Sequence, residues 1–561
     1  MVRSSKEAQL CAGIVFVASL LLYCRTLAPT VTLVDSGELI VTAHFLGVAH
    51  PPGFPLYMML AHLASLVPWG SVALRVNAAS ALFAALASAM LTLVVAELMM
   101  VASSLAALKR SPKKKSGKKM PHGIGLEMER NFRLVVLAPA LVSGLLLAFS
   151  RTHWSYATIA EVYTLNTLLI LSVFFLTLRW RRRIMEDERR VTADVNRPRA
   201  VGITDYDSLL NAAALGFGLA LGVHHVTVGL ILPALAIIVY KTEGAAFFTS
   251  RRLLYAALFS IAGLCAVYSY LPLAASGDAV INWGRPRSLQ EIWSHFIGRQ
   301  YQNYFSFAPE MLGRQVLAFG ELACRQFGRW WLPLALVLAG AGVSYAFKRD
   351  RTTFWFLAPI AFANVAYTLG YDIAEDKDAY YLPTFVAVAT AAGYGLRSLF
   401  EFALSRRWST QKIHLLAAFL VVLVPAIALA SNWPFNNRRQ YFIAQDYVEN
   451  IQSAIAPNGL LLTLDWQVQA PMLYTREVEQ HRRDVKVVDI NLLRRSWYFD
   501  YLQRAYPDLL ERSRQKVDRF VVELQLWEPD PEAYRTLKLT GKTRDSRNES
   551  SSHSMRCSSR S

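Results

Sequence analysis

Long apolar segments recur along most of the chain, and no other feature of the sequence restricts its possible folds as strongly. A helix that crosses the hydrocarbon core of a bilayer needs about 20 mostly apolar residues. Of the 561 residues, 54% are hydrophobic and only 18% are charged, which is too apolar for an ordinary soluble protein of this size. Eleven segments approach the required length: 11–28, 74–100, 134–149, 158–178, 209–223, 226–240, 253–275, 331–347, 354–370, 380–397 and 413–431. The sequence therefore predicts a mainly α-helical, polytopic membrane protein with about 11 transmembrane helices.

The net charge of +18 would also suit a nucleic-acid-binding protein, but the positions of the basic residues argue against that class. Lys and Arg gather in alternate loops between the apolar segments, for example at 109–119, 179–183 and 348–351. Cytoplasmic loops of membrane proteins carry such an excess of Lys and Arg. We therefore predict a cytoplasmic amino terminus, a carboxy-terminal region on the far side of the membrane, and contacts with membrane lipid but not with nucleic acid.

The chain changes character after the last apolar segment. Residues 432–527 combine amphipathic helices with two strands and a Pro-Asn-Gly turn, so we expect a small α/β domain on the far face, above a transmembrane catalytic domain at 1–431. Residues 528–561 are polar and are expected to be disordered. They contain the N-glycosylation sequon at Asn548, which fits an endoplasmic-reticulum or secretory orientation.

Two carboxylates follow the first apolar segment directly, in the stretch LVDSGELIVTAHFLGVAHPPGFP. In one interpretation Asp35 is the N-cap and Glu38 the N3 residue of a helix that runs through Gly47. In the other, the two acids mark a site, because ionisable groups at the membrane edge are costly and usually functional. The two interpretations are compatible, since a cap fixes the direction of a carboxylate. His50, in the rigid turn HPPGFP, would then bind a phosphate or position a substrate hydroxyl.

Further polar residues lie in the other loops that we predict on the far face. The second such loop contributes Arg151, His153 and Glu161, and the third contains His224 and His225. Adjacent residues point to different faces, so the two histidines do not predict a metal site. The five scattered cysteines show no metal-ligand spacing either.

The long loop 276–330 mixes aromatic residues with cations, among them Trp283, Arg285 and Arg287. This mixture suits a sugar that stacks on aromatic rings and a phosphate held by arginine, although an interfacial aromatic belt has the same composition. The loop 371–383 adds Asp376 and Tyr380. We assign to donor-phosphate binding His50, Arg151, His153, His224, Arg285 and Arg287. We assign to substrate positioning Glu161, Trp283, Asp376 and Tyr380.

Together these groups are the ones that glycosyl transfer from a lipid-phosphate sugar requires. The phosphate leaves as a stable anion, so a single carboxylate base suffices to deprotonate the acceptor hydroxyl while Arg or His stabilises the phosphate. Such a reaction strictly requires neither a metal nor another cofactor. A proton-coupled transporter is the alternative from another class, because it also uses intramembrane acids and histidines. No repeated halves are visible, however, and the polar residues cluster in loops of one face. A scaffold without chemistry would use Asp35 and Glu38 only as a helix cap.

The run VDSGELIVTAHFLGVAHPPGFPLY, followed by RVNAASALFAA, resembles the opening signature of the transmembrane protein 260 family. The resemblance continues through HWSYATIAEVYTLN, LGVHHVT, NWGRPRSL and YDIAEDKDAYYLP to the run that begins PNGLLLTLDW, and it covers about residues 10–510. The family consists of multi-spanning glycosyltransferases of the GT-C type, and its animal members resemble protein O-mannosyltransferases of the endoplasmic reticulum.

The resemblance implies an inverting enzyme of the endoplasmic-reticulum membrane with dolichyl-phosphate-mannose as donor. It implies as acceptors Ser/Thr hydroxyls of folded extracellular domains, in animals the immunoglobulin-like plexin-transcription-factor domains of plexin-type receptors. Carried over residue by residue, Asp35 matches the catalytic base of the first luminal loop, and Glu38 belongs to the same motif. Family members are similar in having a longer luminal carboxy-terminal region, whereas this sequence ends in a Ser/Arg-rich tail, a departure that concerns acceptor recognition and activity.

Overall fold

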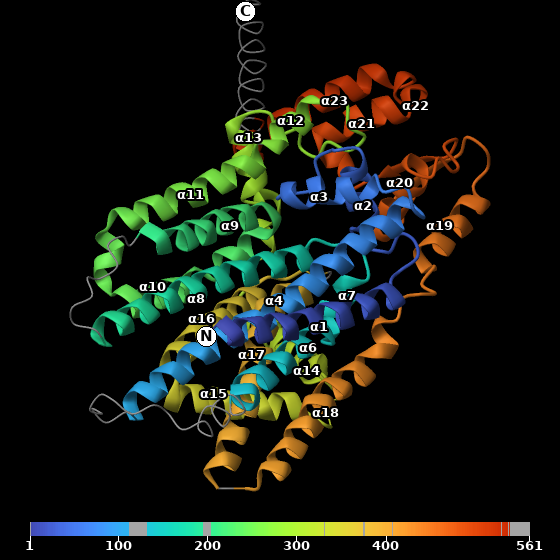
Figure 1. Cartoon of the computed structure of the whole chain (residues 1–561). Helices are drawn as coiled ribbons and strands as arrows, with labels where there is room; N and C mark the ends of the chain where they lie inside the picture. The colour runs from blue at the N-terminus through green and yellow to red at the C-terminus, as the bar shows by residue number, and fades with distance from the viewer. Residues whose placement is uncertain are drawn as a thin grey trace, which may run out of the picture.

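The computed structural model describes residues 2–110, 132–193, 204–329, 331–373, 376–406, 408–528, 530–536 and 538. The sequon at Asn548, the polar tail beyond residue 538 and most of the basic loop 109–119 lie outside these residues. The described chain is mainly helical, as predicted (Figure 1).

A bundle of helices forms the larger part of the molecule. Its elements are α1 (Val2–Thr26), α4 (Val72–Arg110), the π-helical η1 (Arg133–Leu137), α6 (Ala138–Ala148), α7 (Arg151–Ala157), α8 (Tyr163–Ala193), α9 (Thr204–Gly229), α10 (Leu232–Glu243), the 3-10 helix η2 (Ala245–Thr249), α11 (Arg251–Tyr268), α12 (Tyr270–Ser276), α15 (Leu334–Arg349), α16 (Arg351–Gly370), α17 (Leu382–Ser405) and α18 (Thr410–Asn436). The connections carry α13 (Leu289–Phe296), η3 (Arg299–Tyr304), α14 (Pro309–Gln326) and η4 (Lys377–Tyr381). Within the bundle α4 packs against α1, α6 and α8.

Seven helices of the described chain are long and apolar enough to cross a membrane, or eight if the bent pair Arg133–Ala148 and Arg151–Ala157 forms one span. They lie in α1, α4, α8, α9, α11 with α12, α16 and α18. The predicted number of 11 is therefore not confirmed. The three other predicted spans correspond to α10, α15 and α17, and the first two have only 12 and 16 residues. The predicted break between the spans 209–223 and 226–240 lies inside α9, which continues to Gly229 with a kink at His224.

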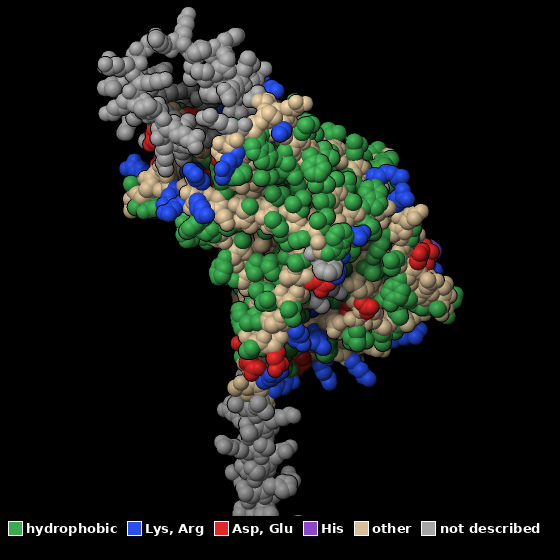
Figure 2. Space-filling model, turned by 90° about the horizontal axis from the view of Figure 1, so that it is seen from below, with side chains coloured by type: hydrophobic (Ala, Val, Ile, Leu, Met, Phe, Trp, Pro, Cys, Tyr) green, Lys and Arg blue, Asp and Glu red, His purple; other side chains and the backbone are tan. Residues whose placement is uncertain are grey.

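The outer surface of the bundle is apolar, as expected for helices that face lipid. On α18, for instance, Leu415, Phe419 and Val422 are each at least 60% exposed. Figure 2 views the molecule from the side on which α15 and α18 lie, and it shows a broad hydrophobic face with Lys and Arg gathered toward its margins.

Small residues allow the helices to approach closely. A Cβ atom on Gly342 of α15 would lie only 1.8 Å from the backbone oxygen of Ala391 in α17. Glycine is therefore required where these two helices cross.

At one end of the bundle, α2 (Ser36–His44) and α3 (Pro55–Ser65) lie beside the carboxy-terminal segment (Figure 1). That segment contains α19 (Ile443–Ala454), β1 (Leu460–Thr463), α20 (Trp466–Glu477), β2 (Lys486–Asp489), η5 (Leu492–Arg494), α21 (Ser496–Ala505), α22 (Pro507–Glu511) and α23 (Arg514–Trp527). The two strands pair in parallel from Leu460↔Lys486 to Thr463↔Asp489, with α20 as the crossover between them. This arrangement confirms the predicted α/β pattern, whereas the domain boundaries at 431/432 and 527/528 stay predictions.

The carboxy-terminal segment shares a hydrophobic core with the first loop of the bundle. Leu473 and Tyr474 of α20 belong to the same buried cluster as Leu39 and Ile40 of α2 and Tyr57 of α3. Residues from the two ends of the chain thereby meet at the place where the sequence predicts a site.

Candidate active site

Asp35 lies in the turn between α1 and α2, directly before the first residue of α2. The backbone reaches it through Val34, whose φ of 66° lies in the left-handed region that β-branched residues rarely adopt. The Asp35 side chain makes no capping hydrogen bond to α2. Its Oδ1 accepts a hydrogen bond from the Nε1–H of Trp466 at 2.7 Å instead. Asp35 and Glu38 thus occupy the N-cap and N3 positions, as predicted, but the Asp35 side chain does not cap the helix, and the helix ends at His44, not at Gly47.

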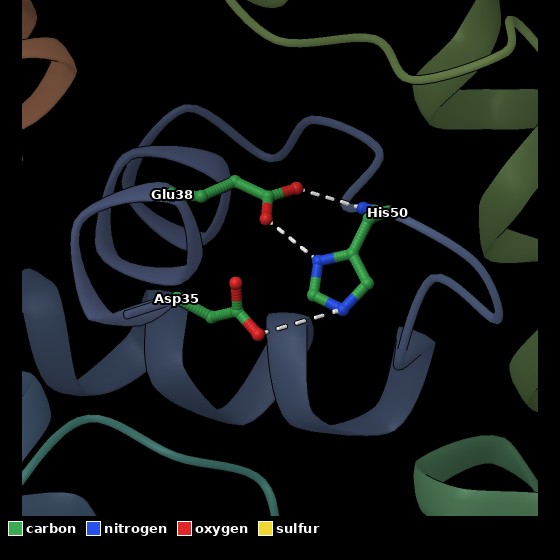
Figure 3. Close-up of side chains that lie close together, drawn as sticks. All are labelled: Asp35, Glu38 and His50. Carbon is green, nitrogen blue, oxygen red and sulfur yellow. Dashed lines mark hydrogen bonds and ion pairs between the residues drawn. The ribbon is translucent and has the colours of Figure 1, made fainter. Parts of the chain in front are cut away.

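Glu38 is fully buried in α2, and both of its carboxylate oxygens hold His50 (Figure 3). Oε1 accepts a hydrogen bond from the backbone N–H of His50 at 2.7 Å, and Oε2 lies 2.6 Å from its Nδ1. The other ring nitrogen, Nε2, lies 3.8 Å from Oδ2 of Asp35. One imidazole ring therefore stands between two carboxylates.

The backbone on either side of His50 is held in place. Before it, Val48 exchanges backbone hydrogen bonds of 3.0 Å with Ile281 and Trp283 of the long loop. After it, Gly53 adopts a φ of 86° and donates its N–H to the carbonyl oxygen of His50 at 2.8 Å. The predicted rigid turn is thus fastened to the loop that carries Trp283.

The electrostatics of this group follow from its burial and its charges. Burial disfavours a charged His50, but the carboxylates of Glu38 and Asp35 outweigh burial and raise the pKa of His50 to about 9. Burial raises the pKa of Asp35, an effect that the neighbouring His50 partly opposes. At neutral pH His50 is therefore positively charged, and Asp35 is a stronger base than an exposed aspartate.

Asp35 and His50 line a cavity of about 600 Å³. The aromatic residues of its wall are Phe54, Tyr163, Trp283, Tyr301, Tyr304, Phe305, Tyr367, Tyr371, Tyr380 and Trp466. Among the described residues that line the cavity there is neither Arg nor Lys. An aromatic wall with a few convergent polar groups is typical of a site for a small organic ligand.

Four further residues that the sequence singles out, His224, Trp283, Asp376 and Tyr380, also line this cavity. Glu161 is buried beside it, and its carboxylate approaches those of Asp35 and Asp376 to within 4.8 Å. Burial, together with the negative charges of Asp376 and Asp35, raises the pKa of Glu161 well above its usual range. Glu161 is therefore harder to ionise than an exposed glutamate.

Two groups of described side chains bring ligand atoms close enough together to hold a metal ion. They are Asp35 with Glu38 and His50, and Asp35 with Glu161 and Asp376. In the first, Glu38 already occupies the Nδ1 of His50. The second consists of three carboxylates, two half-buried at the cavity wall and that of Glu161 buried beside it. We assign a metal to neither group.

Two of the residues predicted to bind the donor phosphate lie in the packed bundle and not at the cavity wall. The guanidinium of Arg151 stacks on the ring of Phe435, 3.4 Å from its centroid. His153 is fully buried, with Nε2 3.2 Å from the backbone oxygen of Ala84.

Arg285 and Arg287 lie outside the cavity as well. Arg285 forms an ion pair with Asp500 of α21. The Nε of Arg287 donates a hydrogen bond to the backbone oxygen of Ala275 at 3.0 Å. Their assignment to phosphate binding stays a prediction, and the contacts seen here are those of side chains that join segments together.

The structure also brings in residues that the sequence analysis assigns no role. Tyr301 and Tyr371 are two of them, and both line the cavity. They lie in the runs QYQNYF and YDIAEDKDAYYLP, whose richness in tyrosine is visible in the sequence. No local sequence pattern indicates a role for Trp466, because its partner Asp35 is 431 residues away.

Comparisons with known proteins show which sequences and structures this chain resembles. Residues 35–246 match the Protein O-mannosyl-transferase TMEM260 N-terminal domain, and residues 443–508 match the TMEM260-associated domain 2. The chain is 27% identical to the Protein O-mannosyl-transferase TMEM260 of Mus musculus over 506 residues, which are 88% of this chain and 64% of that protein. It is 23% identical to the Protein O-mannosyl-transferase tmem260 of Dictyostelium discoideum, covering 88% of this chain and 58% of that protein. The chain thus spans about 60% of the length of these two relatives.

The solved structures that align with this chain have low sequence identity to it. ArnT from Cupriavidus metallidurans, bound to undecaprenyl phosphate, aligns with a TM-score of 0.49 and 13% identity over 86% of this chain and 90% of its own. The archaeal oligosaccharyltransferase AglB from Archaeoglobus fulgidus aligns with a TM-score of 0.45 and 11% identity over 82% of this chain and 59% of its own. Similarities of this size support no inference about the site.

The two matched domains supply the two partners of the central hydrogen bond, since Asp35 lies in the first and Trp466 in the second. Both domain matches, and the two relatives named above, make the chain similar to the transmembrane protein 260 family in its first and its last described parts.

Proposed function

We propose that this protein transfers mannose from dolichyl-phosphate-mannose to Ser/Thr hydroxyls of folded extracellular receptor domains. The observation that carries the proposal is the Asp35 carboxylate at the wall of an aromatic cavity, with a raised pKa and a charged imidazole 3.8 Å away. The relatives in mouse and Dictyostelium, both named protein O-mannosyl-transferases, support the same reaction class.

In the proposed reaction Asp35 takes the proton from the acceptor hydroxyl as its oxygen attacks the anomeric carbon of mannose. The bond from that carbon to the phosphate oxygen breaks, and the electron pair leaves with dolichyl phosphate. Attack and departure on opposite faces of the sugar invert the anomeric configuration. Asp35 therefore acts as the catalytic base in a single displacement.

His50 is the group that we assign to the phosphate. Its ring is charged at neutral pH, and the described wall of the cavity contains neither Arg nor Lys that would serve instead. Tyrosine hydroxyls around the cavity supply further hydrogen-bond donors. The sugar ring would stack on the aromatic wall, to which Trp283 and Tyr380 contribute.

For the location we propose the endoplasmic-reticulum membrane, with the amino terminus in the cytoplasm and the cavity on the luminal side. The alternation of basic loops along the sequence supports this orientation. The proposed acceptors, the immunoglobulin-like plexin-transcription-factor domains of plexin-type receptors, would approach from the lumen.

The test is mannose transfer by the purified full chain in detergent, with dolichyl-phosphate-mannose and a folded plexin-type receptor domain as substrates. Asp35→Asn removes the base and should lower kcat by about 10²–10⁴-fold, the range typical of a general base. Asp446→Asn makes the same substitution at an exposed position of α19 and should leave transfer unchanged.

Equal transfer by wild type and Asp35→Asn would refute Asp35 as the base. No transfer by the wild type, with both substrates shown to be intact, would refute the proposed donor and acceptor pair. Binding of dolichyl phosphate to both proteins serves as the control for folding.

A further inference from the structure

We propose that Trp466 is a positioning residue for Asp35, so that the carboxy-terminal α/β segment completes the active site. This inference rests on the proposed function, because it assigns a role in orienting the proposed base. The geometry that points to it is a direct hydrogen bond between the two matched domains, together with the packing that surrounds that bond.

The hydrogen bond fixes one of the two carboxylate oxygens. Trp466 is the first residue of α20, and its Nε1–H donates to Oδ1 of Asp35 at 2.7 Å. The other oxygen, Oδ2, is the one that lies 3.8 Å from the Nε2 of His50. A neutral donor on Oδ1 orients the carboxylate without cancelling its charge, and Oδ2 is left to accept a proton.

The neighbouring residue of α20 holds the backbone that leads to Asp35. The side-chain Oε1 of Gln467 accepts a hydrogen bond from the N–H of Val34 at 2.7 Å. Val34 is the β-branched residue with a φ of 66°. A residue in this sparsely populated conformation persists only when its surroundings hold it there, and here α20 provides the contact.

The indole of Trp466 is itself held by other aromatic rings. The ring of Trp283 lies 6.0 Å from it and 4.8 Å from the ring of Trp497 in α21. The side chain of Asp465 caps α20 by accepting a hydrogen bond from the N–H of Gln467 at 2.9 Å. The donor is therefore placed by a row of three tryptophans and by a capped helix start.

Trp466→Phe keeps an aromatic ring and removes the N–H. The loss of a hydrogen bond to a charged group should lower kcat by about 10–100-fold while the KM for the donor changes little. Because the lost hydrogen bond stabilises the charged carboxylate, the pKa of Asp35 should rise, and the acid limb of the pH–rate profile should move to higher pH. Trp408→Phe, at an exposed position between α17 and α18, is the matched control and should change neither quantity.

A double-mutant cycle separates positioning from a general structural effect. If Trp466 acts through Asp35, then Trp466→Phe should cause no further loss of transfer in the Asp35→Asn background. Losses that multiply in the double variant would overturn the inference, and so would a lower kcat with an unmoved acid limb.

Failure of this inference is distinguishable from failure of the proposed function. If wild type transfers mannose and Trp466→Phe does so with the same kcat and pH profile, the role of Trp466 is refuted while Asp35 keeps its own. Where the phenylalanine variant does not fold, as judged by dolichyl phosphate binding, benzothienylalanine at position 466 replaces the N–H by sulfur in a side chain of the same shape. The same shift of the acid limb is expected for it, and an unchanged profile overturns the inference.

Discussion

At the scale of single residues, the burial of Glu38 decides how the cavity is charged. Glu38 binds both the backbone N–H and the Nδ1 of His50, so one side chain fixes the position and the charge of the ring. The two form a nearly neutral pair inside the protein, because the carboxylate offsets the imidazolium. Asp35 is then the group of the three that is available to act as a base. Its Oδ1 accepts the hydrogen bond from Trp466, and its side chain makes no capping hydrogen bond to α2.

The pH dependence of transfer should reflect this arrangement. Activity should fall as pH drops through the raised pKa of Asp35, because the base becomes protonated, and as pH rises through about 9, because His50 loses its charge. Glu38→Gln removes the nearest negative charge and should lower the pKa of His50, which moves the basic limb of the pH–rate profile to lower pH. The measurement is kcat/KM against pH for wild type, Glu38→Gln and Glu449→Gln, the last at an exposed position of α19.

If the basic limb of the pH–rate profile does not move in Glu38→Gln, then Glu38 does not set the pKa of His50. A shift of the same size in Glu449→Gln would show that the limb reports general protein charge instead of His50.

At the scale of secondary structure, the crossing of α2 and α20 brings Trp466 to Asp35. A Cβ atom on Gly37 would lie 2.1 Å from the backbone oxygen of Ala470, so the two helices touch backbone to backbone. Leu39 of α2 and Leu473 of α20 belong to one buried cluster. The close approach of α2 and α20 thus depends on a contact that only glycine allows.

Gly37→Ala should push α2 and α20 apart. Overpacking of this kind costs about 1–3 kcal/mol, so we expect a lower midpoint of thermal unfolding and a loss of transfer similar to that of Trp466→Phe. Gly340→Ala, where the new methyl group meets no atom within 4 Å, is the matched control in α15. It should unfold at the wild-type temperature or slightly above, because alanine favours a helix. Wild-type stability and transfer in Gly37→Ala would mean that the helices tolerate separation.

At the scale of the whole molecule, the parts of the site that the sequence predicts are those that local motifs carry. Asp35, Glu38 and His50 stand within one short stretch, and their polar character beside an apolar segment marks them as unusual. Trp466 is different, because its role comes from a pairing of distant segments that no local pattern encodes. Arg285 is a residue for which composition predicts a role that the fold does not show. A cation in an aromatic loop suits phosphate binding, but in the structure Arg285 is paired with Asp500.

The same distinction holds for the helices. Apolar length predicts where the helices are, and the α/β pattern after residue 432 is recovered, because both depend on periodicity within a segment. Whether a helix of 12 or 16 residues, such as α10 or α15, crosses a bilayer depends on its neighbours and on the lipid, which periodicity leaves undetermined.

The proposed orientation of the whole molecule makes a separate prediction. If the carboxy-terminal segment is luminal, the sequon at Asn548 should be glycosylated in microsomes, and Asn548→Gln should abolish one glycan-sized shift on a gel. A sequon introduced into the basic loop 109–119 should stay unmodified, because that loop would face the cytoplasm. Modification of the loop sequon with no modification of Asn548 would reverse the proposed topology.

The contact between Asp35 and Trp466 also has a consequence for biosynthesis. The two residues are 431 positions apart, and a ribosome that adds about 5–20 residues per second needs roughly 20–90 s to make the chain between them. During that interval the first helices are available for membrane insertion, while the carboxylate near the start of the chain still has no tryptophan to orient it. Under the proposed mechanism, a chain whose translation stops early would lack the donor that orients Asp35, and full transfer would begin only when the late segment folds back onto the early one.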